Sequence, residues 1–161
     1  MTLNQIEERL RAIAERHKQI QVVDFGEMSE FLANPASKYP VCFFQDSTGT
    51  IDLSARVLNV NYKIFLLDLV NVSSDAKTNE REVMSDMLEV AKDIVTLIDD
   101  PAFPEWKSDA APFSFIKDEG ADVVAGVAAD ISIGVLTVKD KCAIPKEGPF
   151  LFEDVFNKEM P

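Results

Sequence analysis

The sequence predicts an α+β fold, in which helices pack on a mostly antiparallel sheet with a long central strand and a terminal hairpin. Three observations support this prediction. Residues 79–98 place apolar side chains at helical spacing. Residues 56–72 carry a β pattern much longer than an ordinary strand. Residues 113–138 alternate on both sides of an acidic turn, as a hairpin does. The sheet should therefore be covered by an N-terminal helix and one long helix.

The N-terminal half begins with a well-signalled helix. Thr2 can act as its N-cap, and Gln5 stands where a capping box places Glu or Gln. The polar cluster Asp-Ser-Thr-Gly is typical of a turn. The segments after the helix are predicted, in order, as a short strand, a single helical turn, a strand and this polar turn: residues 20–25, 28–32, 39–45 and 46–49.

The longest β pattern runs from residue 50 to residue 72. Even-numbered positions from Leu58 to Leu66 are apolar, whereas the opposite face is polar up to Lys63 and apolar from Phe65 onward. This change predicts that one half of the strand is covered on both faces and the other half on one. A strand over residues 56–72 would span about 50 Å. Because a body of this size is about 40 Å across, the strand must bend, break or project.

The C-terminal half continues with the long helix at 79–98, whose apolar stripe is wide enough to supply much of the core. Residues 101–112 are predicted as an irregular loop with aromatic side chains packed back on the body. The last pattern is a hairpin, with a strand at 113–117, a turn at 118–120 and a second arm at 121–138. We therefore predict one domain at 1–138 and an extended C-terminal arm of the same domain at 139–161.

Composition excludes several classes of function. The 161 residues carry 16 basic and 28 acidic side chains, for a net charge of −12, and such a surface repels phosphate backbones. No apolar run approaches the roughly 18 residues that a bilayer span needs. The N-terminus lacks the basic start and apolar core of a signal peptide. We expect a protein made in the cytoplasm, with no membrane partner and no specific binding to DNA.

Catalytic and metal-binding motifs are missing from the sequence. His17 is the single histidine, and glycine occurs only six times, with no phosphate-binding pattern. Cys42 and Cys142 stand far apart; a disulfide is possible, but two buried free thiols are favoured in a reducing compartment. The acidic group at 118–122 lacks the ligand ladder of a calcium loop and is interpreted as a solvated turn. We expect no enzyme activity, no cofactor and no metal.

Surplus apolar and extended material points instead to assembly. Asp68 and Asp130 interrupt apolar strands. The ordinary explanation is protection of a sheet edge, and the sharper one is a salt bridge at a subunit interface. In the C-terminal arm, Phe150, Phe152 and Phe156 are too apolar for a free tail. The arm either clamps a neighbouring subunit or folds onto its own, and the sequence leaves both alternatives open.

The order of elements resembles that of the tail terminator, or tail-completion, proteins of long-tailed bacteriophages of the lambda-like kind. The resemblance covers most of residues 1–138 and rests on topology and local sequence. It is carried by the Tyr-Pro-Val-Cys-Phe-Phe run at 39–44, the long strand at 56–69, the helix at 79–98 with Val-Met-Ser-Asp-Met at 83–87, and the hairpin that leads from 113–120 into 130–135.

The resemblance implies a structural role in the virion, at the tail or neck. Such proteins form a ring, usually a hexamer, that caps the tail tube and joins the tail to the head. The expected partners are other copies of the chain, the tail tube protein and the head–tail connector proteins, while DNA passes through the ring. Two alternatives remain: a head–tail connector or neck protein, and a non-viral cytosolic adaptor module.

Overall fold

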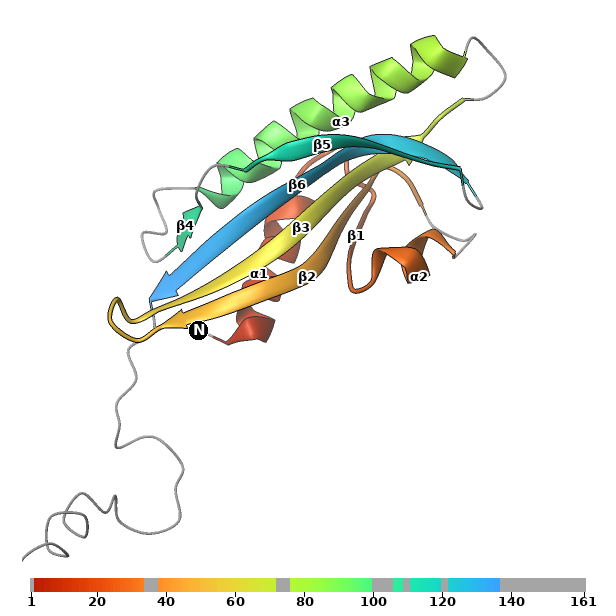
Figure 1. Cartoon of the computed structure of the whole chain (residues 1–161). Helices are drawn as coiled ribbons and strands as arrows, with labels where there is room; N and C mark the ends of the chain where they lie inside the picture. Colours follow the sequence, from red (N-terminus) through yellow and green to blue (C-terminus); the bar gives the residue numbers. More distant parts are fainter. Residues whose placement is uncertain are drawn as a thin grey trace, which may run out of the picture.

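The computed structural model describes residues 2–33, 38–71, 76–99, 106–108, 111–119 and 122–136. Within them the chain has an α+β fold, with three helices and a six-stranded, mostly antiparallel sheet, as the sequence predicts (Figure 1). The elements in chain order are α1 (Leu3–Glu15), β1 (Val22–Phe25), α2 (Met28–Leu32), β2 (Val41–Asp52), β3 (Val57–Leu69), α3 (Ala76–Ile98), β4 (Trp106–Ser108), β5 (Phe113–Glu119) and β6 (Val123–Leu136).

The sheet is built on three long antiparallel strands, β2, β3 and β6, in that order. The short β1 runs parallel to the first residues of β2. Along the edge that faces away from β3, β6 pairs with two strands in succession, β5 near its beginning and β4 near its end. The long strands curve together and extend past the helices at one end (Figure 1). The predicted long strand therefore both bends and projects.

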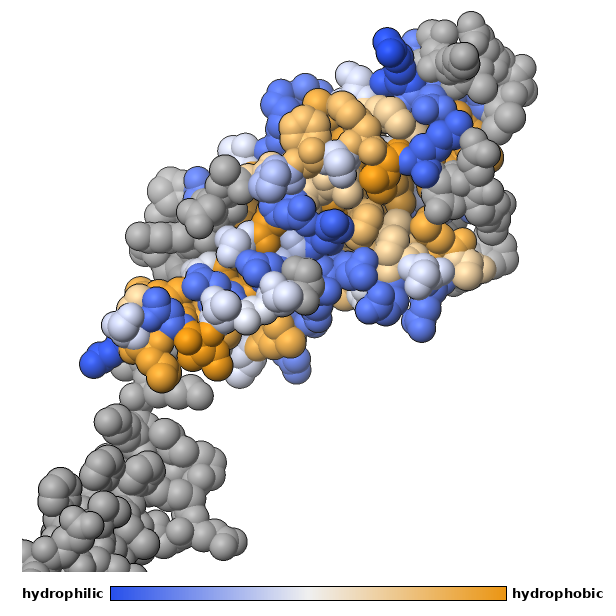
Figure 2. All heavy atoms as spheres, viewed as in Figure 1, coloured by the Kyte–Doolittle hydropathy of each residue, from blue (hydrophilic) through white to orange (hydrophobic). Residues whose placement is uncertain are grey.

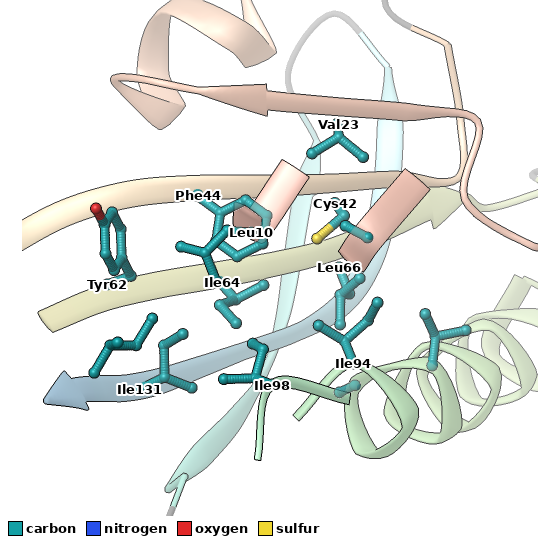
Figure 3. Close-up of a cluster of buried hydrophobic side chains, with 14 of the residues drawn as sticks. Leu10, Val23, Cys42, Phe44, Tyr62, Ile64, Leu66, Ile94, Ile98 and Ile131 are labelled. Carbon is teal, nitrogen blue, oxygen red and sulfur yellow. The ribbon is translucent and has the colours of Figure 1, made fainter. Parts of the chain in front are cut away.

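The principal core lies on one face of the sheet, under α1 and α3. Leu10 of α1 and Ile94 and Ile98 of α3 lie over strand residues that point toward them (Figure 3). Those strand residues include Cys42, Phe44, Tyr62, Ile64, Leu66 and Ile131. Met87 and Ile94 of α3 are both almost fully buried, so the prediction that this helix supplies much of the core is confirmed. The helix begins at Ala76, earlier than predicted.

A second core lies on the opposite face, under α2. It is smaller and joins the short helix to the neighbouring parts of the long strands through Met28, Tyr39, Val41, Phe43, Leu67 and Val124. We call the part of the sheet between the two cores, residues 41–44, 64–67 and 124–129, the proximal half. We call residues 45–52, 57–63 and 130–136 the distal half. The predicted contrast between a doubly and a singly covered half is confirmed.

The N-terminal helix is anchored as its sequence predicts. The Thr2 hydroxyl accepts from the Gln5 N–H, and the Gln5 side chain accepts from the Thr2 N–H at 2.8 Å, which completes the capping box. Arg11 lies with its guanidinium 5.0 Å from the centre of the Phe25 ring and donates to the Val23 carbonyl at 2.7 Å. These contacts fix α1 against β1.

The structure corrects the predicted turn at 46–49. These residues are part of β2, with a register shift between Asp46 and Thr48 that marks a bulge. The chain reverses instead at 53–56. There the Asp52 carboxylate accepts from the Ser54 hydroxyl and from two backbone N–H groups, and these hydrogen bonds hold the pKa of Asp52 below its usual value. The polar cluster at 46–49 is compatible with a bulge as well as with a turn. The chain turns at 53–56 because the hydrogen bonds of Asp52 stabilise the reversal there.

Two smaller predictions also change. The segment predicted as an irregular loop, 101–112, contains β4, which pairs with the end of β6. β5 continues to Glu119, through the first two residues of the predicted turn, because the ladder with β6 is maintained to that point. Gly120 and the arm at 139–161 lie outside the described residues.

Candidate interaction surfaces

The structure defines the surroundings of His17 and Cys42, two residues considered for chemistry in the sequence. Among the described residues, no group of three or more His, Cys, Asp or Glu side chains could hold a metal ion, and no polar or charged residue is buried. His17 lies at the end of α1, with Nε2 3.2 Å from Asp93 Oδ2 of α3. Cys42 is buried in the principal core, and this burial raises the pKa of its thiol, so it is a poor nucleophile. Cys142 lies outside the described residues.

Asp68 is half-buried on the α1–α3 face of β3. Because β3 lies between β2 and β6, protection of a sheet edge does not explain it. Its carboxylate accepts from the Leu69 N–H at 2.8 Å. Burial raises the pKa of Asp68, and the nearby Asp86 carboxylate raises it further, while the Leu69 hydrogen bond opposes the shift. A subunit-interface role for Asp68 stays a prediction.

Asp130 lies on the opposite face of the sheet, in the distal half. Its strand, β6, is also an inner strand, so edge protection does not explain this residue either. The Asp130 carboxylate lies 3.6 Å from Nζ of Lys63, its partner across the strands. Both side chains are substantially exposed, so the pair contributes little to stability. The structure therefore does not bring Asp68 and Asp130 together, and the interface role of Asp130 also stays a prediction.

The open face of the distal half is a polar ladder. Asn61 Nδ2 donates to Thr48 Oγ1 at 2.9 Å, next to the Lys63–Asp130 pair. These cross-strand contacts satisfy polar side chains on a face that no described helix covers. The polar side chains at odd-numbered positions of β3 can be recognised in the sequence, but their cross-strand partners depend on the register of the sheet.

At the boundary between the halves, the Tyr62 phenol experiences the charges of two carboxylates. The Tyr62 hydroxyl is buried, and no described residue forms a hydrogen bond with it. Burial raises its pKa, and the carboxylates of Asp46 and Glu7 act in the same direction. The pKa of Glu7 is itself raised by burial and by Asp46, against the opposing charge of Arg11. The cluster is a cost to stability rather than a site with an evident ligand.

The most exposed large apolar side chains among the described residues lie at the distal end of the long strands. We call Ile51, Leu53 and Leu136, whose exposed fractions are 69%, 85% and 58%, the distal tip. By the register, Ile51 lies on the face of Val135 in the principal core and Leu136 on the opposite face, so the tip includes both faces of the sheet. Figure 2 shows orange atoms gathered at the end of the molecule where Figure 1 places the β2–β3 turn. Sequence reasoning missed this surface because a turn at 46–49 made Ile51 part of a strand interior. The signal that could have found it is Asp52 followed by Ser54, which favours a local turn.

A second exposed surface follows β5. Phe113 and Phe115 are 52% and 53% exposed, and their rings meet edge to face with centroids 5.7 Å apart. Within the described residues β5 pairs with β6 alone, so its outer edge is open there. The contact residues predicted in the arm, Phe150, Phe152 and Phe156, lie outside the described residues.

No protein-family model and no curated protein matches the chain. Among the described helices, none is both long enough and apolar enough to cross a membrane.

Proposed function

We propose that this chain is a structural protein of a long-tailed bacteriophage, which forms a ring on the end of the tail tube and joins the tail to the head. The proposal combines the order of elements with one observation of the structure, the exposed distal tip. Its partners are further copies of the chain, the tail tube protein and the head–tail connector proteins. The role requires no enzyme activity.

The distal tip supports the proposal because it exposes large apolar side chains at the end of a projecting hairpin. Full burial of a Leu or Ile side chain contributes roughly 1.5–3 kcal/mol. Most of this free energy is unused for Ile51 and Leu53 in the isolated chain. A projecting apolar surface of this kind is typical of a protein–protein contact.

The position of the tip favours a ring. The tip extends past the helices at one end of the sheet, and the second core lies toward the other end (Figure 1). A tip that contacts a different surface on the next copy makes a heterologous contact, and heterologous contacts with a suitable rotation close into rings. With a net charge of −12 on each copy, the assembled ring would repel DNA and let it pass without specific binding.

The experiment is measurement of assembly in wild type and a tip variant, Ile51→Ser with Leu53→Ser. Light scattering coupled to gel filtration, followed by electron microscopy, is expected to show rings of wild type, alone or with tail tubes. The tip variant should be a folded monomer that unfolds cooperatively. Leu97→Ser is the matched control, because Leu97 is also exposed but lies on α3, and it should assemble normally. A wild-type protein that stays monomeric with tail tubes present contradicts the proposal.

A further inference from the structure

The outer edge of β5 is unpaired within the described residues and lies apart from the distal tip. Its register with β6 runs from Phe113 opposite Ala129 to Glu119 opposite Val123, which occupies one side of β5 only. Within the described residues no strand pairs with the other side. Backbone donors and acceptors along such an edge form hydrogen bonds with any extended segment that lies beside it.

The side chains of β5 make this edge selective. Phe115 shares its register position with Val127 of the principal core, so Phe113, Phe115 and the next odd residue, Lys117, lie on the α3 side of the sheet. Lys117 Nζ lies 2.9 Å from Glu80 of α3. Orange atoms gather over the part of the body where Figure 1 shows β5 (Figure 2). The edge thus presents two half-exposed aromatic rings followed by a cation.

The C-terminal arm contains a segment with the complementary pattern. Residues 150–156 read Phe-Leu-Phe-Glu-Asp-Val-Phe, with Phe150 and Phe152 at alternate positions and Asp154 next in the series. A parallel alignment on β5 places these three residues beside Phe113, Phe115 and Lys117 respectively. Aromatic pairs and an opposite-charge pair are the favourable cross-strand neighbours in a sheet.

The chain has the length to reach this edge from its own β6. Leu136, the last residue of β6, is seven residues past Ala129, the partner of Phe113, which corresponds to about 24 Å along the strand. The 13 residues at 137–149 would reach at most about 43 Å if fully extended, so the chain is long enough to cover this separation. A linker that can span two sites raises the effective concentration of one at the other. The segment also arrives in the direction in which β5 runs, away from the distal tip, as the parallel alignment requires.

We infer that residues 150–156 of the same chain bind the outer edge of β5 as an added parallel strand. Of the two alternatives for the arm, the structure thus favours folding onto its own subunit, because effective concentration favours the attached segment over one from another copy. The added strand covers the edge and the two phenylalanines of β5. This inference does not depend on the proposed function, since a ring could form through the distal tip with the arm in this place.

Disulfide trapping tests the inference. In a Cys142→Ser background, Ser114→Cys and Leu151→Cys introduce thiols at neighbouring positions of the proposed pair, at a spacing that a disulfide can bridge. Ser114 is exposed, and the remaining Cys42 is buried. The control pairs Leu151→Cys with Ala55→Cys, in the exposed turn beside the distal tip and near the end of β6. We expect the 114–151 disulfide to form within one chain and about ten-fold faster than the control or more.

Amide hydrogen exchange provides a second measurement that needs no substitution in β5. Truncation after Gly148 should increase exchange of β5 amides several-fold, while amides of α1 keep their protection. Equal rates for the two cysteine pairs, or a 114–151 disulfide found only between chains, overturn the inference. Unchanged exchange along β5 after truncation overturns it as well. A ring that assembles normally in any of these cases leaves the proposed function intact.

Discussion

The proximal and distal halves of the sheet are built from the same three strands, yet they differ in what covers them. In the proximal half, residues 64, 66 and 67 of β3 are almost fully buried, between the principal core and the second core. In the distal half, β3 buries Tyr62 on one face and exposes the polar ladder on the other. A single strand therefore serves as a core element at one end and as a support for a projecting surface at the other.

The difference shows that the alternation of apolar and polar side chains determines whether one or both faces of a strand are covered. Where both faces are apolar, two layers of helix bind and the strand becomes an inner layer. Where one face is polar, only one layer binds, and that part of the strand keeps a solvated face. Both halves contribute to the principal core, but only the proximal half also packs against the second core, and only the distal half ends at the exposed tip.

The largest effect expected from this comparison is that of a charge placed in the principal core, compared with one placed at the distal tip. Ile94 of α3 is fully buried in the principal core, whereas Leu53 at the distal tip is 85% exposed. Ile94→Asp should unfold the domain, because an unpaired buried carboxylate costs several kcal/mol, and Met87→Asp should do the same. Leu53→Asp should change the free energy of unfolding by less than about 0.5 kcal/mol. Urea denaturation measures both, and a cooperatively melting Ile94→Asp protein with normal stability would show that α3 is peripheral.

A methyl group added to a glycine should have a smaller effect that again differs between the halves. A Cβ on Gly126, in the proximal half, would lie 1.9 Å from the Leu66 carbonyl oxygen, whereas one on Gly49 would lie 3.1 Å from that of Asn59. Gly126→Ala forces the backbones of β3 and β6 apart and should cost about 3 kcal/mol. Gly49→Ala needs only a small shift and should cost less than about 1 kcal/mol. Equal melting temperatures for the two variants would contradict the close approach at Gly126.

Local signals were sufficient for much of the fold. The capping box of Thr2 and Gln5 locates the start of α1, and the wide stripe of α3 identifies a core helix, because both depend on residues within a few turns of one another. The switch of face polarity at Phe65 predicts which part of β3 is covered twice. The β2–β3 reversal was misplaced because residues 46–49 satisfy the requirements of a bulge and of a turn equally, and only the pairing of the strands distinguishes them.

The candidate surfaces were harder to predict because they depend on strand order. Asp68 and Asp130 stand out in the sequence as acids within apolar strands, but nothing local shows that both strands are inner ones or that Lys63 lies across from Asp130. The exposed edge of β5 follows from the absence of a further described strand beside it. The alternation of Phe113 and Phe115 can be seen in the sequence. Only the strand order shows that they lie on a strand whose outer edge is unpaired among the described residues.

The smallest expected effect concerns the protonation of Asp68. It distinguishes a carboxylate that only destabilises the monomer from one that also takes part in a subunit interface. Because burial and Asp86 raise the pKa of Asp68 in the folded protein, the folded state binds a proton more readily than the unfolded chain does. The free energy of unfolding therefore decreases as the pH rises from the ordinary value of 3.8 through the raised pKa, and stays lower above it. Asp68→Asn removes this cost and should stabilise the monomer at pH 7 by about 0.5 kcal/mol, with the gain disappearing below about pH 4.

Urea denaturation at pH 7 and at pH 4 measures the effect, with Asp130→Asn as the control on the open face. Asp130 is paired with an exposed lysine, so its variant should be unchanged or slightly less stable at pH 7. A monomer that loses stability at pH 7 on the Asp68→Asn substitution would show that the carboxylate is favourably placed within its own subunit. If Asp68→Asn instead stabilises the monomer but weakens assembly, the charge of Asp68 takes part in a contact with another subunit.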